Sequence, residues 1–179
     1  MDAAAAPRSA GACISAKGLS DDGARVRLSS ASAALVDGAT DRNGAFEIFL
    51  ADLAAGVAAL LSATSDGVAA DGGSGSGAIS GDGTVAAVQT NAALAGTDDN
   101  GANDVYVVDL ADGGSAIRAS VAADGAPIAG QSPLSDISAD GRFVVFATSD
   151  GFAPGHDADV FRVENALFQQ TCGGRASTG

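Results

Sequence analysis

Short apolar runs alternate with polar turns along the whole chain. The runs are rich in β-branched and aromatic residues and are bounded by Gly and Asp, which is typical of strands. Ala and Leu are frequent between residues 51 and 61, but Gly56 and Val57 interrupt that stretch and favour strand-turn-strand over helix. The pattern therefore predicts an all-β protein with short strands at residues 26–28, 47–50, 57–61, 85–88, 104–108, 117–121, 143–146 and 159–163.

One unit recurs along the chain. The sequence ISGDG at 79–83 returns as ISADG at 137–141, 58 residues later, and a more divergent copy, LSDDG, lies at 19–23. A period of this length predicts an array of supersecondary units. Each copy holds a Ser-x-Asp-Gly turn and two apolar runs. The first two copies add a third run, and a further short strand fits just before the next turn. Four antiparallel strands per copy predict one β-propeller blade.

These residues resemble the TolB-type (WD-like) bacterial β-propeller repeat. The resemblance covers about residues 14–165, and the first copy departs most, with Arg25 and Arg27 in the strand and Glu47 in place of Asp. It implies four-stranded antiparallel blades and a periplasmic or extracellular location. The matching residues are Ser138, Asp140, Gly141, Arg142, Phe143, Val144 and Phe146 in the third copy, and Asp98, Asn100, Gly101, Asp104, Val105, Tyr106, Val107 and Asp109 in the second.

The array holds fewer blades than a closed ring needs. The copies span about 19–78, 79–136 and 137–165, between tails at 1–13 and 166–179. After Val163 the Asp-Leu turn of the other copies is replaced, and residues 169–179 match no part of the repeat. Closed propellers typically have four to eight blades. About three blades therefore predict an incomplete ring, which is either a segment of a larger propeller or a subunit that self-associates.

Charge limits the classes of partner. Nine Lys and Arg against 22 Asp and Glu give a net charge of −13 over 179 residues. We expect no nucleic-acid partner and no attraction to anionic membranes, because both require basic patches. The apolar stretches are too short to insert into a bilayer. The N-terminus lacks the features of a signal peptide, so either the protein stays inside the cell or this chain lacks its native start. Cys13 and Cys172 are either bridged or free thiols.

Two loops carry candidate metal ligands. Oxygen-bearing side chains surround a Gly at the spacing of part of a Ca²⁺ loop. The alternative is that these side chains bond turn N–H groups as Asx turns, and the incomplete loop pattern favours this alternative. The third copy retains only Asp159, with His156 and Asp157 in a shortened loop. The candidate Ca²⁺ ligands are Asp41, Asn43 and Glu47 in the first loop and Asp98, Asn100 and Asp104 in the second.

No motif indicates catalysis. The Gly-rich tract at 72–77 matches neither nucleotide-binding pattern, and no Gly-x-Ser-x-Gly motif occurs. The acids that close strands, Asp52, Asp109 and Glu164, are either a ligand-facing ring or charges that protect strand ends, and we favour protection. We therefore expect a protein that is not an enzyme and has no catalytic residues or required cofactor.

The loop before the second run of each copy differs in length while the strands are retained. From the turn Gly to that run the copies measure 25, 22 and 19 residues. Variable loops on a rigid repeat are where binding usually occurs. We therefore predict a non-catalytic binding or scaffolding module, whose loops at 35–44, 91–103 and 149–157 contact a protein or a surface polymer. The alternatives are an accessory propeller segment of a larger hydrolase or peptidase, and a Ca²⁺-stabilised adhesion repeat.

Overall fold

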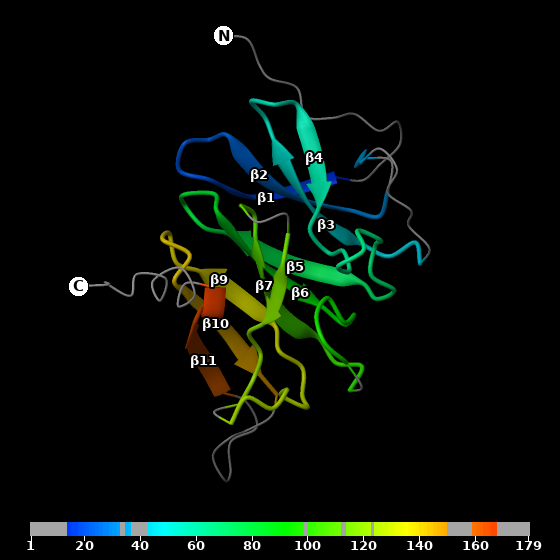
Figure 1. The fold of residues 1–179 in the computed structure, drawn as a ribbon, viewed down its shortest axis with the longest axis vertical. Helices are drawn as coiled ribbons and strands as arrows, with labels where there is room; N and C mark the ends of the chain where they lie inside the picture. The colour runs from blue at the N-terminus through cyan, green and yellow to red at the C-terminus, as the bar shows by residue number, and fades with distance from the viewer. Residues whose placement is uncertain are drawn as a thin grey trace, which may run out of the picture.

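The computed structural model describes residues 14–32, 35–36, 43–98, 100–111, 114–122, 124–149 and 159–167. Within these ranges the chain forms three antiparallel sheets that lie beside one another without closing a ring (Figure 1). We call them blades 1, 2 and 3. The prediction of an all-β fold with about three propeller-like blades is confirmed. Blade 1 holds β1 (Ile14–Leu19), β2 (Arg25–Ser30), β3 (Glu47–Asp52) and β4 (Val57–Leu60); blade 2 holds β5 (Ser74–Ile79), β6 (Val85–Thr90), β7 (Asp104–Asp109) and β8 (Ala116–Arg118); blade 3 holds β9 (Leu134–Ile137), β10 (Phe143–Thr148) and β11 (Asp159–Glu164).

Strands that follow one another in the chain are neighbours in each sheet. The strand expected just before each Ser-x-Asp-Gly turn exists, as β5 and β9, but it does not complete the blade before it. It pairs with the strand after the turn, so β5 joins β6 and β9 joins β10. The turn is a hairpin between the first two strands of one blade. Blade 3 accordingly has three strands within the described residues.

The Ser-x-Asp-Gly turn has the same hydrogen bonds in every blade. The Ser hydroxyl donates to the Asp carboxylate over 2.6 Å in the pairs Ser20–Asp22, Ser80–Asp82 and Ser138–Asp140. The same hydroxyl accepts the backbone N–H five residues on, and the carboxylate accepts the N–H two residues on. The Gly that follows has φ near +70° in all three turns, a conformation that disfavours a side chain.

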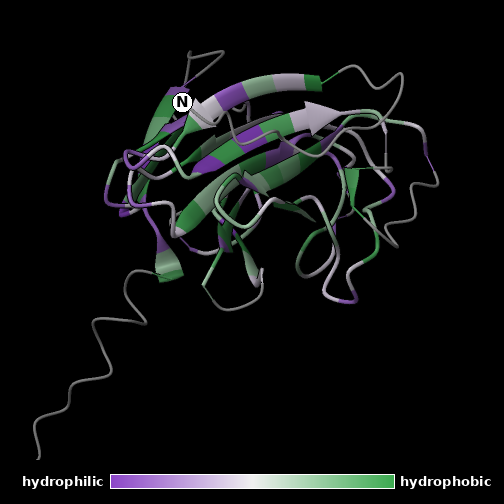
Figure 2. Cartoon of the chain, turned by 90° about the horizontal axis from the view of Figure 1, so that it is seen from above, coloured by the Kyte–Doolittle hydropathy of each residue, from purple (hydrophilic) through white to green (hydrophobic). Residues whose placement is uncertain are grey.

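Blades pack face to face through alternate residues of their strands. Ile48 and Leu50 of β3 face blade 2 and meet Tyr106 and Val108 of β7 in one buried cluster. Val105 of β7 points the opposite way, with Val107, into a second cluster shared with blade 3. This alternation explains why β7 is buried on both faces, whereas the face of β3 away from blade 2 is buried under Leu28 and Leu35. In Figure 2 hydrophobic residues run along the strands, interrupted by short hydrophilic segments.

The two end blades keep one outward face each. In blade 1 that face holds Phe49 and Ala51, with Leu28 and Leu35 packed against them. In blade 3 it includes Val160, whose side chain is exposed. No helix in the described part of the chain is long and apolar enough to cross a membrane.

Candidate functional site

Each of the two predicted Asn loops forms the same contacts. The side-chain oxygens of Asn43 and Asn100 accept the backbone N–H two residues on, each over 2.7 Å. Their side-chain nitrogens donate to the carbonyl oxygens of Ala70 and Ile128, each over 2.9 Å. Each Asn thus stabilises its own turn and ties it to the segment leading to the next blade. These contacts are those of an Asx turn.

The acid at the start of each third strand is buried beside a Ser. Asp104 is fully buried and accepts a hydrogen bond from the Ser120 hydroxyl over 2.6 Å. That hydroxyl in turn accepts the backbone N–H of Val105. Blade 1 repeats the arrangement, with Glu47 accepting from Ser62. Because these groups are buried, each pair fixes the end of a fourth strand against the third strand.

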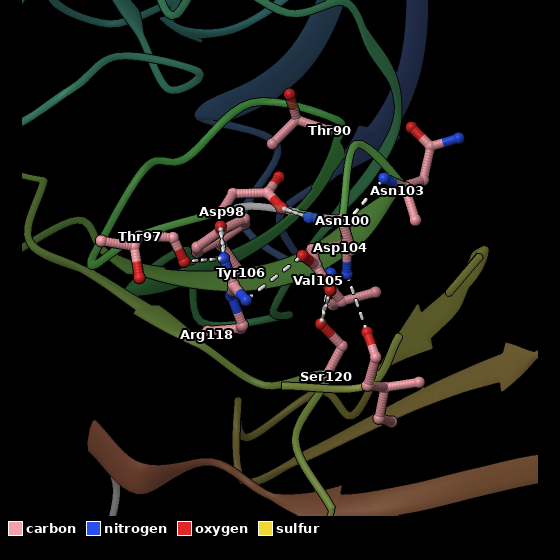
Figure 3. Close-up of polar contacts among 12 residues, drawn as sticks. Thr90, Thr97, Asp98, Asn100, Asn103, Asp104, Val105, Tyr106, Arg118 and Ser120 are labelled. Atoms are coloured by element: carbon pink, nitrogen blue, oxygen red, sulfur yellow. Dashed lines mark hydrogen bonds and ion pairs between the residues drawn. The ribbon is translucent and has the colours of Figure 1, made fainter. Parts of the chain in front are cut away.

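In blade 2 the network extends to two larger side chains (Figure 3). Arg118 Nη1 lies 3.5 Å from Asp104 Oδ2, and Arg118 Nη2 donates to the Tyr106 hydroxyl over 2.9 Å. Arg118 Nη2 also donates to the carbonyl oxygen of Thr97. Burial raises the pKa of Asp104, an effect that Asp98 reinforces and that Ser120 and Arg118 oppose. Burial likewise raises the pKa of Tyr106. Blade 1 has Leu60 where blade 2 has Arg118, so this extension belongs to blade 2 alone among the described blades.

Two buried carboxylate oxygens in this network, Asp98 Oδ2 and Asp104 Oδ2, have no hydrogen-bond partner. A Ca²⁺ ion requires six to eight oxygen ligands. The Asn100 oxygen already accepts a backbone N–H, and the Arg118 guanidinium lies beside Asp104. In the described ranges no three or more His, Cys, Asp and Glu side chains group around a common point. The geometry supports the Asx-turn interpretation, and Ca²⁺ binding at the second loop stays a prediction.

The remaining predicted ligands lie in the first loop. Asn43 Nδ2 reaches Glu47 Oε1 over 3.4 Å, so these two side chains do come together. Asp41 lies outside the described residues, as do His156, Asp157, Cys13 and Cys172. Ca²⁺ binding at this loop therefore stays a prediction, and for Cys13 and Cys172 both a bridge and free thiols stay open.

The strand-closing acids stabilise turns at the end of the blades opposite the Asn loops. Asp52 accepts the backbone N–H of Ala55 over 2.9 Å, and Asp109 accepts that of Ala111 over 2.8 Å. Glu164 forms an ion pair of 2.9 Å with Arg142. These contacts support the interpretation that the acids protect strand ends.

Two features of the structure have no counterpart among the sequence motifs. Arg118 is a lone Arg in a short apolar run, and nothing in its spacing points to Asp104 or Tyr106. The second feature is a groove of about 970 Å³ between the outer strands of blades 1 and 2. Small residues line it, from β4, residues 63–67, residues 93–96 and residues 114–116. Their small side chains leave this groove open. The high Ala and Gly content of the sequence does not by itself predict a groove at this place.

Comparisons with known proteins support the fold. No protein-family model matches the chain, and no curated protein matches its sequence. A solved TolB structure from Agrobacterium tumefaciens matches with a TM-score of 0.51 and 20% identity over 85% of this chain. TolB from Acinetobacter baumannii matches with a TM-score of 0.47 and 18% identity, over 82% of this chain and 29% of the TolB chain. The tricorn protease matches with a TM-score of 0.47 and 14% identity, over 84% of this chain and 13% of the protease chain.

The chain spans about half the length of the Agrobacterium protein, 46%, so that structure continues well beyond what three blades supply. At this identity the likeness shows the fold alone. It agrees with the repeat in the sequence and with the three antiparallel sheets. The chain has the TolB-type β-propeller fold.

Proposed function

We propose that this chain is a non-catalytic propeller module that binds protein, and that a second copy of the chain completes its ring. The observation that carries the proposal is the exposure of one residue. Val160 of β11 is 74% exposed, whereas its equivalents in the other blades, Ile48 and Val105, are 0% exposed. Both equivalents are buried because a following blade covers them. Blade 3 therefore presents an interblade face that another blade can cover.

The opposite end of the array carries the corresponding positions. Phe49 and Ala51 of blade 1 occupy the positions through which Tyr106 and Val108 of blade 2 contact the blade before them, and here Leu28 and Leu35 pack against them, so both are 0% exposed. On β1, which lies beyond β2 in the same blade, Leu19 is 57% exposed. Exposed apolar residues at both ends of a stack support association through those ends.

A backbone contact sets the register in which blades stack. The N–H of Asp21 donates to the carbonyl of Gly81 over 2.7 Å, and the N–H of Asp82, one position later in its turn, donates to that of Ala139 over 3.3 Å. The corresponding contact in a closed ring would run from the N–H of Ala139 or Asp140 to the Asp21 carbonyl of another copy. Two copies of three blades give a total of about six, which lies within the range of closed propellers. We propose this head-to-tail closure for the protein.

The variable loops are the proposed ligand-binding elements of the completed ring. The loop at 91–103 is held by Asn100, so it is a defined element of the rigid scaffold. The loops at 35–44 and 149–157 lie mostly outside the described residues. We propose that the loops contact a protein or a surface polymer.

Light scattering across a range of concentrations tests the self-association. We expect a wild-type dimer and a Val160→Asp monomer, because a charge on the interblade face opposes its burial. Val57→Asp is the matched control, since Val57 is 56% exposed on the outer strand β4, and we expect it to remain dimeric. Circular dichroism checks that each variant is folded. A folded wild-type monomer at every concentration would contradict the proposal.

A further inference from the structure

β4 forms the outer edge of blade 1. It pairs with β3 on one side and ends its sheet on the other. The N–H of Leu61 donates to the Ile48 carbonyl over 2.8 Å, which fixes the alternation of the antiparallel ladder. Ala59 therefore bonds β3, whereas Ala58 and Leu60 direct their backbone N–H and C=O groups outward. Such an edge is a template for another strand.

The β4 edge lacks the charged residues and Pro that usually protect an edge strand. Residues 54–61 contain neither, and Val57 is 56% exposed. By contrast, the edge strands β1, β8 and β9 each carry a charge, at Lys17, Arg118 and Asp136. The backbone of β4 is thus open to pairing with an incoming strand.

The groove of about 970 Å³ lies along this edge. Ala59 faces blade 2, because it is paired with Leu50, which packs in the cluster between blades 1 and 2. At the same position one blade later, Ile117 is paired with Val107 and packs against the cluster shared with blade 3. The small side chain of Ala59 therefore leaves open the space that Ile117 fills in the next blade.

Two of the variable loops also line the groove. Val36 belongs to the loop at 35–44, and residues 93–96 belong to the loop at 91–103. These loops are the proposed ligand-binding elements of the module. The groove, the loops and the edge of β4 therefore form one continuous surface within a single copy of the chain.

The chemistry of this surface favours a peptide over a polysaccharide. None of the described residues that line the groove is aromatic or charged, so it offers no ring on which a sugar could stack. The outward N–H and C=O groups of Ala58 and Leu60 match a peptide backbone, and the small lining residues leave room for its alternate side chains. The net charge of −13 favours a peptide that carries Lys or Arg.

We propose that an extended peptide of a partner protein binds in this groove and adds a strand to the edge of β4. Alternate apolar side chains of the peptide lie between blades 1 and 2, and Lys or Arg residues flank them. The proposal rests on the proposed binding function of the loops and names the form of the partner. It needs one copy of the chain and is independent of the self-association.

Selection from a phage-displayed library of random peptides tests the groove. We expect wild type to select peptides with alternating apolar residues and flanking Lys or Arg. Ala59→Phe fills the groove and should weaken their binding at least about tenfold. Ala54→Phe is the matched control, because Ala54 is exposed in the turn before β4 and does not line the groove, and it should bind as wild type does. Circular dichroism checks that both variants are folded.

Two results would overturn the proposal. If the selected peptides bind Ala59→Phe as tightly as wild type, the groove is not the peptide site, although the binding function of the module would stand. If wild type selects no peptide, the partner is not an extended peptide, and the binding function would then require a folded protein surface or a polymer.

Amide hydrogen exchange in the complex with a selected peptide tests the added strand. The amides of Ala58 and Leu60 should exchange at least about tenfold more slowly when the peptide is bound, whereas that of Ala59, already bonded to β3, should change little. Ala58→Pro removes one outward N–H without removing a bond to β3, so it should weaken peptide binding in a folded protein. Unchanged exchange at Ala58 and Leu60 would overturn strand addition at this edge.

Discussion

Ser120 donates a hydrogen bond to Asp104 over 2.6 Å, and both side chains are buried in blade 2. The hydroxyl also accepts the N–H of Val105, so one side chain satisfies a buried carboxylate and a buried backbone donor. Ser62 does the same for Glu47 and Ile48. The pair therefore fastens the end of the fourth strand to the start of the third strand, and its energetic role can be measured.

Ser120→Ala should lower the free energy of unfolding by about 2 kcal/mol, because it leaves a buried carboxylate oxygen and a buried N–H without their partner. Ser115→Ala is the control, since its side chain is exposed beside the same strand, and its effect should stay within about 0.5 kcal/mol. Urea unfolding of both variants measures the difference. Equal stabilities would show that the Ser120 hydroxyl does not stabilise the blade.

The pH dependence of stability should report the burial of Asp104. Because burial raises the pKa of Asp104 above 3.8, the folded protein retains a proton that the unfolded chain releases just above that pH. The contribution of Asp104 to the free energy of unfolding is therefore fully present below pH 3.8 and is lost as the pH rises through the folded pKa. Asp104→Asn removes this dependence, so the stability of wild type relative to the variant should fall as the pH rises.

Asp82→Asn should change the pH dependence in the opposite direction. Burial opposes ionisation of Asp82, but hydrogen bonds from Ser80 and Thr84 outweigh it and hold its pKa below 3.8. Asp82 thus contributes stability above pH 3.8 that is lost as the pH falls through its folded pKa. Denaturant titrations of wild type and both variants from about pH 3 to pH 7 give the stability of wild type relative to each variant at each pH. If this difference changes with pH in the same direction for Asp104→Asn and Asp82→Asn, the two pKa assignments are contradicted.

Calcium binding is tested by melting temperature. We expect millimolar Ca²⁺ to leave the melting temperature unchanged relative to a chelator control, because the Asn100 oxygen already bonds Ala102 and Arg118 lies beside Asp104. Asp98→Asn supplies the matched variant, since one oxygen of Asp98 is buried without a hydrogen-bond partner. If Ca²⁺ raises the melting temperature of wild type but not that of Asp98→Asn, the predicted calcium site would be established instead.

The repeat and its strands could be predicted because they depend on local sequence. Strand residues alternate with Gly and Asp turns, and the Ser-x-Asp-Gly turn depends on contacts within five residues, as between Ser80 and Val85. The prediction that β5 and β9 complete the preceding blade is wrong. A linear repeat does not show where one sheet ends and the next begins, and the hairpin at each Ser-x-Asp-Gly turn places β5 with β6 and β9 with β10.

The polar network of blade 2 was only partly predictable. Asp98, Asn100 and Asp104 flank a Gly within one loop, so their grouping can be predicted from the sequence. Arg118 was missed because it reaches Asp104 only after β7 pairs with β8, a long-range register that one strand's sequence does not encode. The same limit applied to Ser120, whose partner lies 16 residues earlier in the chain.

Packing between blades 2 and 3 predicts a difference between two Gly→Ala substitutions. Gly141 and Gly125 both have positive φ, at 69° and 84°, so an added Cβ strains either backbone by about 1 kcal/mol. A Cβ at Gly141 would also lie 3.0 Å from Val85 Cγ2 of blade 2, whereas one at Gly125 meets nothing within 4 Å. Overpacking of this kind typically adds about 1–3 kcal/mol.

Gly141→Ala should therefore destabilise the protein by at least about 1 kcal/mol more than Gly125→Ala, as measured by urea unfolding. Val85→Ala in the Gly141→Ala background should recover part of the loss, because it removes the Cγ2 atom that the new methyl group approaches. Val85→Ala alone should be destabilising, since Val85 packs against the cluster between blades 2 and 3. Additive effects of the two substitutions would mean that the turn of blade 3 does not press against blade 2 at this point.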